Sequence, residues 1–224
     1  PTGPFGGHAT LGNDIGGVWK FDEISGTTAN DSKNTNDGTA SNARIFTTEA
    51  AGKRNTCADF TQGNDVISIA SDSSISGDTM SYSFWVKGNG SISSLQILLF
   101  KAPDTGFNRE ISIEFDSSGY MQVQAYRTSP NASGNIKTDS VVWSTSWKHY
   151  LVVKDLSGGN TRLTLYQDGT SIKQGTLSYK ANTNTTSYRI GAAQTNTTPT
   201  YNYFFNGWID EMYFWKAALT ADDA

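Results

Sequence analysis

Short runs of alternating apolar and polar residues recur along most of the chain, each bounded by Gly, Asn, Asp or Ser. A period of two is typical of strands that bury one face, and no window shows the 3.6-residue period of a long amphipathic helix. The pattern therefore predicts an all-β fold. The runs expected to form strands are residues 18–23, 65–70, 81–87, 95–101, 110–116, 120–126, 147–155, 161–167, 187–193 and 207–215.

The connections between these runs favour antiparallel pairing. Asp168-Gly169 is a strong two-residue hairpin signal directly after the run at 161–167. Turn residues recur throughout, and no linker divides the middle of the chain. We therefore expect one antiparallel two-sheet jelly-roll sandwich over residues 18–224. Residues 1–17, rich in Gly, are expected to form a linker or N-terminal extension.

The charge balance narrows the choice of partners. The chain has 17 Lys and Arg residues against 21 Asp and Glu residues, a formal net charge of −4. An acidic chain is a poor match for nucleic acid or for an anionic membrane surface. No apolar run approaches the roughly 20 residues that cross a bilayer, so membrane insertion is not expected.

Cysteine usage bears on the compartment. Cys57 is the single cysteine, so no internal disulfide is possible, and its setting in TCADF fits a small buried residue. One cysteine together with abundant Asn, Ser and Thr favours a bacterial surface or secreted protein over a disulfide-rich eukaryotic domain. We expect an extracellular or cell-surface location, as a module of a larger protein.

Several segments, taken in order, resemble the laminin-G-like (pentraxin-like) branch of the concanavalin A-like lectin/glucanase superfamily. They are VWKFDE at 18–23, ADFTQGNDVISIA at 58–70, MSYSFWVKG at 80–88, SWKHYLVVKD at 146–155 and FNGWIDEMYFW at 205–215. The resemblance implies two curved sheets with the first and last strands adjacent. It also implies bound calcium, a buried Trp in 80–88, and in many members glycan recognition.

The resemblance places the calcium where the first and last strands meet. Asp22 and Asp210 follow Phe21 and Ile209, which we expect to point into the core, and the loop with Ser25 and Thr28 lies nearby. Two carboxylates with backbone carbonyls are oxygen ligands that suit Ca²⁺. The alternative is two solvent-facing acids on strand edges. Asn64-Asp65 loosely resembles a pentraxin calcium loop, but the match is two residues long and a plain turn is the preferred explanation.

One segment, EISIEFD at 110–116, carries an acidic pattern that invites comparison with the related glucanases. Alternation places Glu110, Ser112, Glu114 and Asp116 on one face. Glu110 and Glu114 would lie about 13 Å apart at about 3.3 Å per residue, too far for the carboxylate pair of a glycosidase. Glu114 and Asp116 remain a formal pair. We interpret this face as polar surface or binding groove, and hydrolysis as the third hypothesis.

The aromatic residues divide into two groups. Those within strands are expected to form the core: Trp19, Phe21, Phe60, Phe84, Trp85, Trp147, Tyr166 and Phe214, with His149 packed beside Trp147. Others flank two long polar loops at 128–140 and 195–206, where a sugar ring can stack on them and polar groups can bind hydroxyls. The expected glycan-binding residues are Asn108, Arg109, Tyr126, Arg127, Trp143, Tyr201 and Tyr203.

These observations predict a calcium-stabilised, lectin-like carbohydrate-binding module without catalytic activity. Its expected partner is a polysaccharide or host glycoconjugate, and its expected role is glycan adhesion by a bacterial surface or secreted protein. An adhesin, a pilus component and a polysaccharide-processing enzyme are the candidate parent proteins. A protein-interaction or spacer module without sugar affinity is the alternative from a different class.

Overall fold

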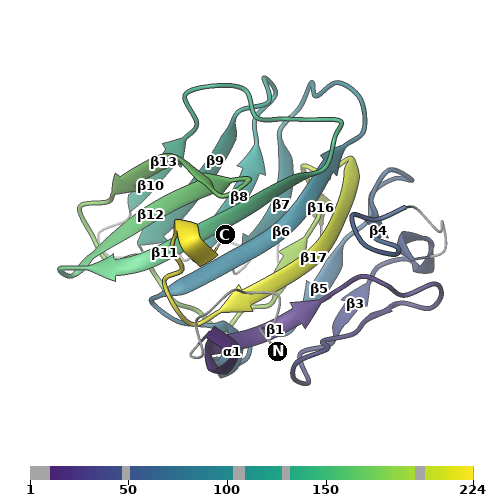
Figure 1. The fold of residues 1–224 in the computed structure, drawn as a ribbon, viewed down its shortest axis with the longest axis horizontal. Helices are drawn as coiled ribbons and strands as arrows, with labels where there is room; N and C mark the ends of the chain where they lie inside the picture. Colours follow the sequence, from purple (N-terminus) through teal and green to yellow (C-terminus); the bar gives the residue numbers. More distant parts are fainter. Residues whose placement is uncertain (1–10, 47–50, 103–108, 128–131, 195–199, 224) are drawn as a thin grey trace.

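The chain folds as two antiparallel β-sheets stacked face to face, which confirms the all-β jelly-roll prediction (Figure 1). This computed structural model describes residues 11–46, 51–102, 109–127, 132–194 and 200–223. The helical elements within these ranges are short: α1 (Leu11–Asp14) and the 3-10 turns η1 (Ala43–Ile45), η2 (Ser73–Ile75) and η3 (Ala221–Asp223). None of them has the length and apolar character of a membrane span.

The seven-stranded sheet runs in the order β1 (Ile15–Trp19), β17 (Gly207–Trp215), β6 (Met80–Gly88), β11 (Lys148–Ser157), β12 (Asn160–Gln167) and β13 (Thr170–Thr176), with β4 (Ala58–Asp59) also paired to β17. The eight-stranded sheet runs in the order β10 (Ala132–Lys137), β9 (Met121–Arg127), β8 (Ile111–Phe115), β7 (Gln96–Lys101), β14 (Tyr188–Ile190), β5 (Ile67–Ile69), β3 (Gly38–Ala40) and β2 (Thr28–Ala29). A separate pair joins β15 (Ala193–Gln194) to β16 (Tyr201–Asn202).

The first and last long strands of the chain are neighbours, as the resemblance implied. Val18 lies opposite Tyr213, and Trp19 lies opposite Met212. Strand β1 begins at Ile15, so residues 15–17 of the predicted linker belong to the sheet. The predicted loop at 128–140 contains the edge strand β10. Its Ser, Gly and Asn residues show no alternation of apolar and polar positions, so the sequence pattern did not predict a strand there.

Alternation along β6 decides which aromatic residues enter the core. Tyr82, Phe84 and Val86 all belong to the cluster between the sheets. Trp85 stands between two inward positions and must therefore face outward, where it is partly exposed. The prediction of a buried Trp85 was wrong. Trp147 and Tyr166 are also only partly buried. His149 packs against Trp85 with the two rings tilted by 50° and their centroids 5.3 Å apart.

A buried charge cluster joins the two sheets. Glu110 Oε1 lies 2.7 Å from Lys154 Nζ of β11, and Glu110 Oε2 lies 3.0 Å from Lys101 Nζ of β7. All three side chains are at most 1% exposed. Glu110 precedes β8 and turns inward, so it does not share a face with Ser112 and Glu114 as predicted. One carboxylate therefore balances ammonium groups from both layers.

Replacing Glu110 with Gln should destabilise the fold strongly, because it leaves two buried ammonium groups without a counter-charge. Breaking a buried ion pair in this way costs about 3–5 kcal/mol. The control is Asp139→Asn, which removes an exposed ion pair with Lys173 and should cost about 0–1 kcal/mol. Urea unfolding of both variants measures the difference. Equal losses would show that the cluster contributes no more than a surface pair.

Candidate functional site

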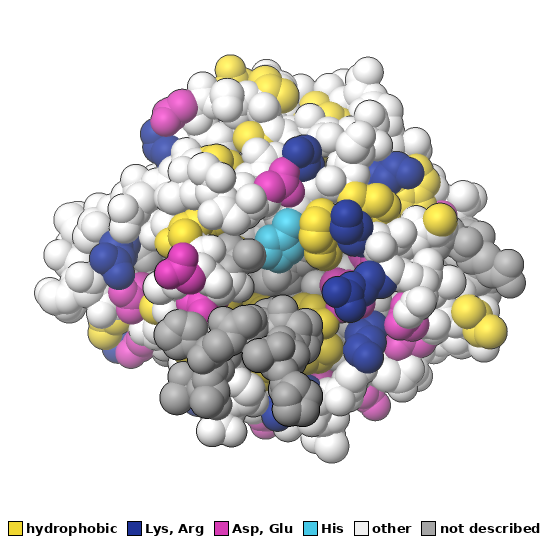
Figure 2. Space-filling model, in the orientation of Figure 1, with side chains coloured by type: hydrophobic (Ala, Val, Ile, Leu, Met, Phe, Trp, Pro, Cys, Tyr) yellow, Lys and Arg dark blue, Asp and Glu magenta, His cyan; other side chains and the backbone are white. Residues whose placement is uncertain are grey.

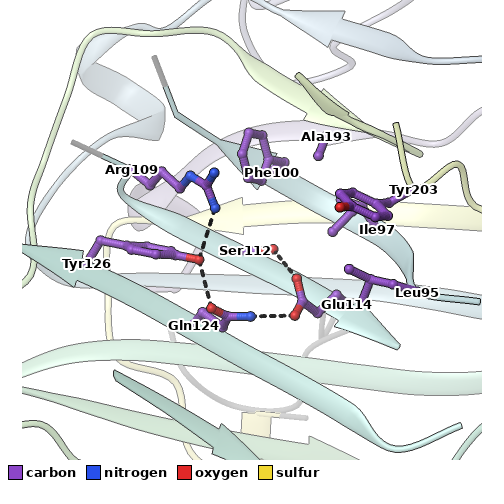
Figure 3. A pocket seen from close by; sticks show the side chains of 10 residues that line it. All are labelled: Leu95, Ile97, Phe100, Arg109, Ser112, Glu114, Gln124, Tyr126, Ala193 and Tyr203. Atoms are coloured by element: carbon purple, nitrogen blue, oxygen red, sulfur yellow. Dashed lines mark hydrogen bonds between the residues drawn. The ribbon is translucent and has the colours of Figure 1, made fainter. Parts of the chain in front are cut away.

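A pocket of about 240 Å³ opens on the outer face of the eight-stranded sheet (Figure 3). Its side chains alternate along the strands with the core residues Ile111, Ile113, Val123 and Ala125, which explains why they face outward. The residues that line it are Leu95, Ile97, Phe100, Arg109, Ser112, Glu114, Gln124, Tyr126, Ala193 and Tyr203.

A bulge in β7 shapes the apolar wall of this pocket. The pairing with β8 shifts between Ile97 and Leu99, so Leu98 and Leu99 both pack in the core. Ile97 and Phe100, although three residues apart, then lie together on the outer face with Ala193. Without the shift, alternation would send one of the two inward.

A continuous chain of hydrogen bonds forms the polar floor (Figure 3). The hydroxyl of Tyr126 donates to Gln124 Oε1 (2.7 Å), and Gln124 Nε2 donates to Glu114 Oε1. Ser112 Oγ donates to Glu114 Oε2 (2.7 Å), and Arg109 Nη1 lies 3.5 Å from the hydroxyl of Tyr126. The polar atoms are therefore oriented before any ligand arrives.

Charge is separated across the pocket. Burial raises the pKa of Glu114, an effect that the hydrogen bonds from Ser112 and Gln124 oppose. The Arg109 guanidinium lies 5.6 Å from the Phe100 ring centroid and 5.4 Å from that of Tyr126. It forms no ion pair with any described carboxylate. A cationic end and an acidic end thus face one cavity, with spare donors on Arg109.

The predicted binding residues fall into two groups. Arg109, Tyr126 and Tyr203 line the pocket, with Tyr203 half exposed. Tyr201 lies in β16 opposite Gln194, two residues from Tyr203. Asn108 lies outside the described residues, as do parts of both loops, 128–131 and 195–199.

Arg127 and Trp143 lie elsewhere. Arg127 follows Tyr126 on β9, so it points to the opposite side, where its guanidinium lies 4.7 Å from the Tyr179 ring centroid. Trp143 packs edge-on against Phe115 and Phe205 and donates its indole N–H to the carbonyl of Gly90. Its role in this structure is packing at the rim of the core.

Gln124 and Phe100 are lining residues that the sequence argument missed. Gln124 was detectable, because it stands two residues before Tyr126 and shares its face. Phe100 was not, because a strict period of two gives no sign of the bulge in β7.

The second acid of the formal glycosidase pair is engaged elsewhere. Asp116 accepts backbone hydrogen bonds from Ser118 and Tyr120 in the turn after β8, and its Oδ2 lies 2.6 Å from Lys137 Nζ. It is not a lining residue. Glu114 is the one carboxylate among the described residues that line the pocket.

The two acids predicted to bind calcium both contact the segment before Cys57. Asn55 Nδ2 donates to Asp22 Oδ2 (3.1 Å), and the backbone N–H of Arg54 donates to Asp210 Oδ2 (2.9 Å). Asp22 Oδ1 is buried and accepts no hydrogen bond from any described residue, so it fits a cation. Asp210 is fully buried, which excludes the solvent-facing alternative for this acid, and burial raises its pKa to about 7.

The remaining metal candidates give less support. Ser25 and Thr28 are exposed. The described residues hold no group of three or more His, Cys, Asp or Glu side chains arranged for a metal, so calcium at Asp22 and Asp210 would need backbone carbonyl ligands. Asp65 forms a two-point ion pair with Arg44, a structural role. Calcium stays a prediction.

Comparison with known families identifies the fold lineage. The profile of the concanavalin A-like lectin/glucanases superfamily matches residues 61–224, well over half of the chain. The chain belongs to this superfamily. Strand β1 and residues up to 60 precede the match, yet they complete the same two sheets. No curated protein sequence matches the chain significantly.

Solved structures share the superfamily fold at low identity. Domain 4 of AbnA, a GH43 extracellular arabinanase from Geobacillus stearothermophilus solved with arabinotriose, has a TM-score of 0.66 at 20% identity, covering 94% of this chain and 96% of that one. The botulinum neurotoxin serotype D binding domain has a TM-score of 0.69 at 10% identity over 96% of this chain, which spans about half (51%) of that chain.

A third structure is the CBM40 of a Ruminococcus gnavus IT-sialidase, bound to α2,3-sialyllactose. Its TM-score is 0.55 at 15% identity, over 65% of this chain and 79% of that one. At these identities the likeness shows the superfamily fold alone.

Calcium should raise the melting temperature of the protein, and chelator should reverse the rise. An ion that binds only the folded state stabilises it by about 2.7 kcal/mol at 100 times its Kd. Asp22→Asn should abolish the response, whereas Asp139→Asn, at an exposed carboxylate, should retain it. Thermal melts with calcium and with EDTA measure both. A calcium response that survives in Asp22→Asn would place the ion elsewhere.

Proposed function

We propose that this chain is a non-catalytic carbohydrate-binding module and that the pocket on the eight-stranded sheet is its glycan site. The observation that carries the proposal is the pocket's combination of exposed ring and pre-oriented polar floor. Tyr203 offers a half-exposed ring, and Phe100 lines the same cavity. The apolar C–H face of a pyranose or furanose ring stacks on such surfaces.

The polar floor provides selectivity between sugars. Each Glu114 oxygen accepts one hydrogen bond from the protein, and a carboxylate oxygen has a further lone pair to accept from a sugar hydroxyl. Arg109 supplies donors at the other end. A sugar with the wrong hydroxyl orientation would leave these partly buried groups unpaired, at about 1–3 kcal/mol each.

The superfamily neighbours support this assignment. The arabinanase domain was solved with arabinotriose, the sialidase module with sialyllactose, and a related botulinum domain is described through its interaction with gangliosides. Two of these are parts of larger proteins, domain 4 of an extracellular arabinanase and the CBM40 of a sialidase. We infer the same setting here: an extracellular module, stabilised by calcium, that attaches its parent protein to a glycan.

Tyr203→Ala and Arg109→Ala should each weaken glycan binding about tenfold, because each removes a stacking or charged contact worth on the order of 1 kcal/mol. Affinity for a single glycan should be millimolar to high micromolar, about −4 to −6 kcal/mol. A glycan array identifies the ligand, and calorimetry measures the affinity.

The control is Arg127→Ala, which removes an arginine on the same strand that faces away from the pocket and should leave affinity unchanged. Melting temperatures of the Tyr203 and Arg109 variants should match the parent. Loss of binding in Arg127→Ala alone would refute the assignment of the pocket. No binding to any array glycan would favour a spacer or protein-interaction module.

Glycoside hydrolysis should be absent, because neither neighbouring acid can serve as a partner for Glu114. Glu110 is paired with Lys101 and Lys154 in the buried cluster, and Asp116 is bonded within the turn after β8 and to Lys137. Two-carboxylate mechanisms need a second acid at about 5–9.5 Å across the sugar. Incubation of array-positive glycans with the protein should release no reducing ends. Sustained release that disappears in Glu114→Gln would show that the pocket is catalytic.

A further inference from the structure

A second surface stands on the outer face of the seven-stranded sheet, on the opposite side of the sandwich from the pocket. Trp85 of β6 and Trp208 of β17 lie on this face, and both are partly exposed. Trp147, one residue before β11, is partly exposed. It is two residues from His149 and therefore faces outward on the same side of the sheet. Three indoles thus gather at one end of three adjacent strands.

Strand register places these rings close together. Trp208 is paired with Lys87, and Lys87 is two residues from Trp85 on β6. On the other side of β6, Lys148 is paired with Val86, so Trp147 is the residue in register with Lys87. Trp85 is further braced by the His149 ring, whose Nε2 lies 2.7 Å from Ser83 Oγ.

Cations lie directly on these rings. Lys53 Nζ is 4.2 Å from the Trp85 ring centroid, and Lys87 Nζ is 4.8 Å from that of Trp208. Arg54, next to Lys53, is exposed. Figure 2 shows Lys and Arg side chains clustered on this face beside the histidine and hydrophobic side chains. We call Trp85, Trp147, Trp208, Lys53, Arg54 and Lys87 the tryptophan platform.

The cations of the platform form no direct ion pair with the described residues. Lys53, Arg54 and Lys87 take part in no ion pair between described residues. Three acids lie beside the platform: Asp59 is paired with Trp208, Asp210 is paired with Trp85, and Glu211 follows Asp210. All three are buried, and each accepts a hydrogen bond from the protein: Asp59 from the Thr61 N–H, Asp210 from the Arg54 N–H, and Glu211 from the Tyr213 hydroxyl. Lys53, Arg54 and Lys87 are more exposed than these acids, so in a chain of net charge −4 the groups that this surface presents to a partner are cations, which favours an anionic partner.

The geometry points to an extended acidic polysaccharide, a chain of uronic acid residues, as the ligand of the tryptophan platform. Sugar rings would stack on the indoles, and their carboxylates would pair with the lysines and Arg54. A lysine over an exposed ring is held by a weak cation–π contact, so it can move aside for a sugar and keep its charge nearby. The three indoles lie side by side across adjacent strands, so successive rings of one polymer chain can reach them together.

Polygalacturonate, with one carboxylate per ring, is the probe, and its fully methyl-esterified form is the neutral control. The parent should bind the acid form at least about tenfold more tightly by affinity electrophoresis. Binding should weaken about tenfold or more between about 0.1 M and about 1 M NaCl, since the screening length falls from about 10 Å to about 3 Å.

The double variant Lys53→Gln/Lys87→Gln should lose about tenfold in affinity for the acid form, and Trp208→Ala should lose a similar factor for both forms. Arg162→Gln, which removes a cation elsewhere on the same sheet that is already paired with Asp155, should bind like the parent. Arg109→Ala and Tyr203→Ala should also bind like the parent, because they change only the pocket.

Three results would overturn the proposal. The first is no retardation of the parent by polygalacturonate. The second is loss of polygalacturonate binding in Arg109→Ala but not in the lysine variant, which would assign the acid chain to the pocket. The third is Trp208-dependent binding to phosphatidylglycerol vesicles without polysaccharide binding, which would make the surface a membrane contact. The first and third results leave the glycan-array result for the pocket unaffected, whereas the second would add an acidic glycan to the ligands of the pocket.

Discussion

Antiparallel strands send successive side chains to opposite faces, and the interior between two stacked sheets accepts only one of the two sets. In this sandwich the inner set is Phe, Tyr, Ile, Leu and Val from both layers, packed around Trp19, Phe84 and Phe214. The side chains available for recognition on the two outer faces therefore belong to the outward-pointing set. Glu114, Gln124 and Tyr126 on one sheet, and Trp85 and Trp208 on the other, are outward residues held at fixed spacing by an inward set that cannot slip.

The buried charge cluster adds a second constraint to this packing. Glu110 holds ammonium groups from β7 and β11, and Asn184 donates its backbone N–H to the same carboxylate. An isolated charge in such a place would be prohibitively costly, so the three groups must be positioned together. The cluster therefore ties the start of β8, where the pocket begins with Arg109, to both sheets at once.

Periodicity and ordered motifs predict the fold well, because the signal is spread over many residues. Each of these residues needs only to be apolar at every second position of its strand. The pairing of β1 with β17 and the inward positions of Phe21 and Ile209 follow from them.

The site was predictable in part. Arg109, Tyr126 and Tyr203 meet in one pocket, but Arg127 and Trp143 do not, because proximity to a loop says nothing about the face on which a side chain lies. Glu110 and Trp85 were both predicted on the wrong face. Glu110 precedes strand β8, so the alternation of that strand does not apply to it. Trp85 follows the alternation of β6 and faces outward, but the resemblance to the family was given more weight than this alternation.

The bulge at Leu98 allows the residues that line the pocket to change without changing those that fill the core. A strand without it would have to choose between Ile97 and Phe100 for its outer face, whereas the bulged strand presents both and still fills the interior with Leu98 and Leu99. Insertion or loss of a single residue at this point would exchange one pocket wall for another while most of the sandwich keeps its register. A lineage of such modules can therefore alter the lining of this pocket by changing strand length at one position, a route that does not require a new set of interior contacts.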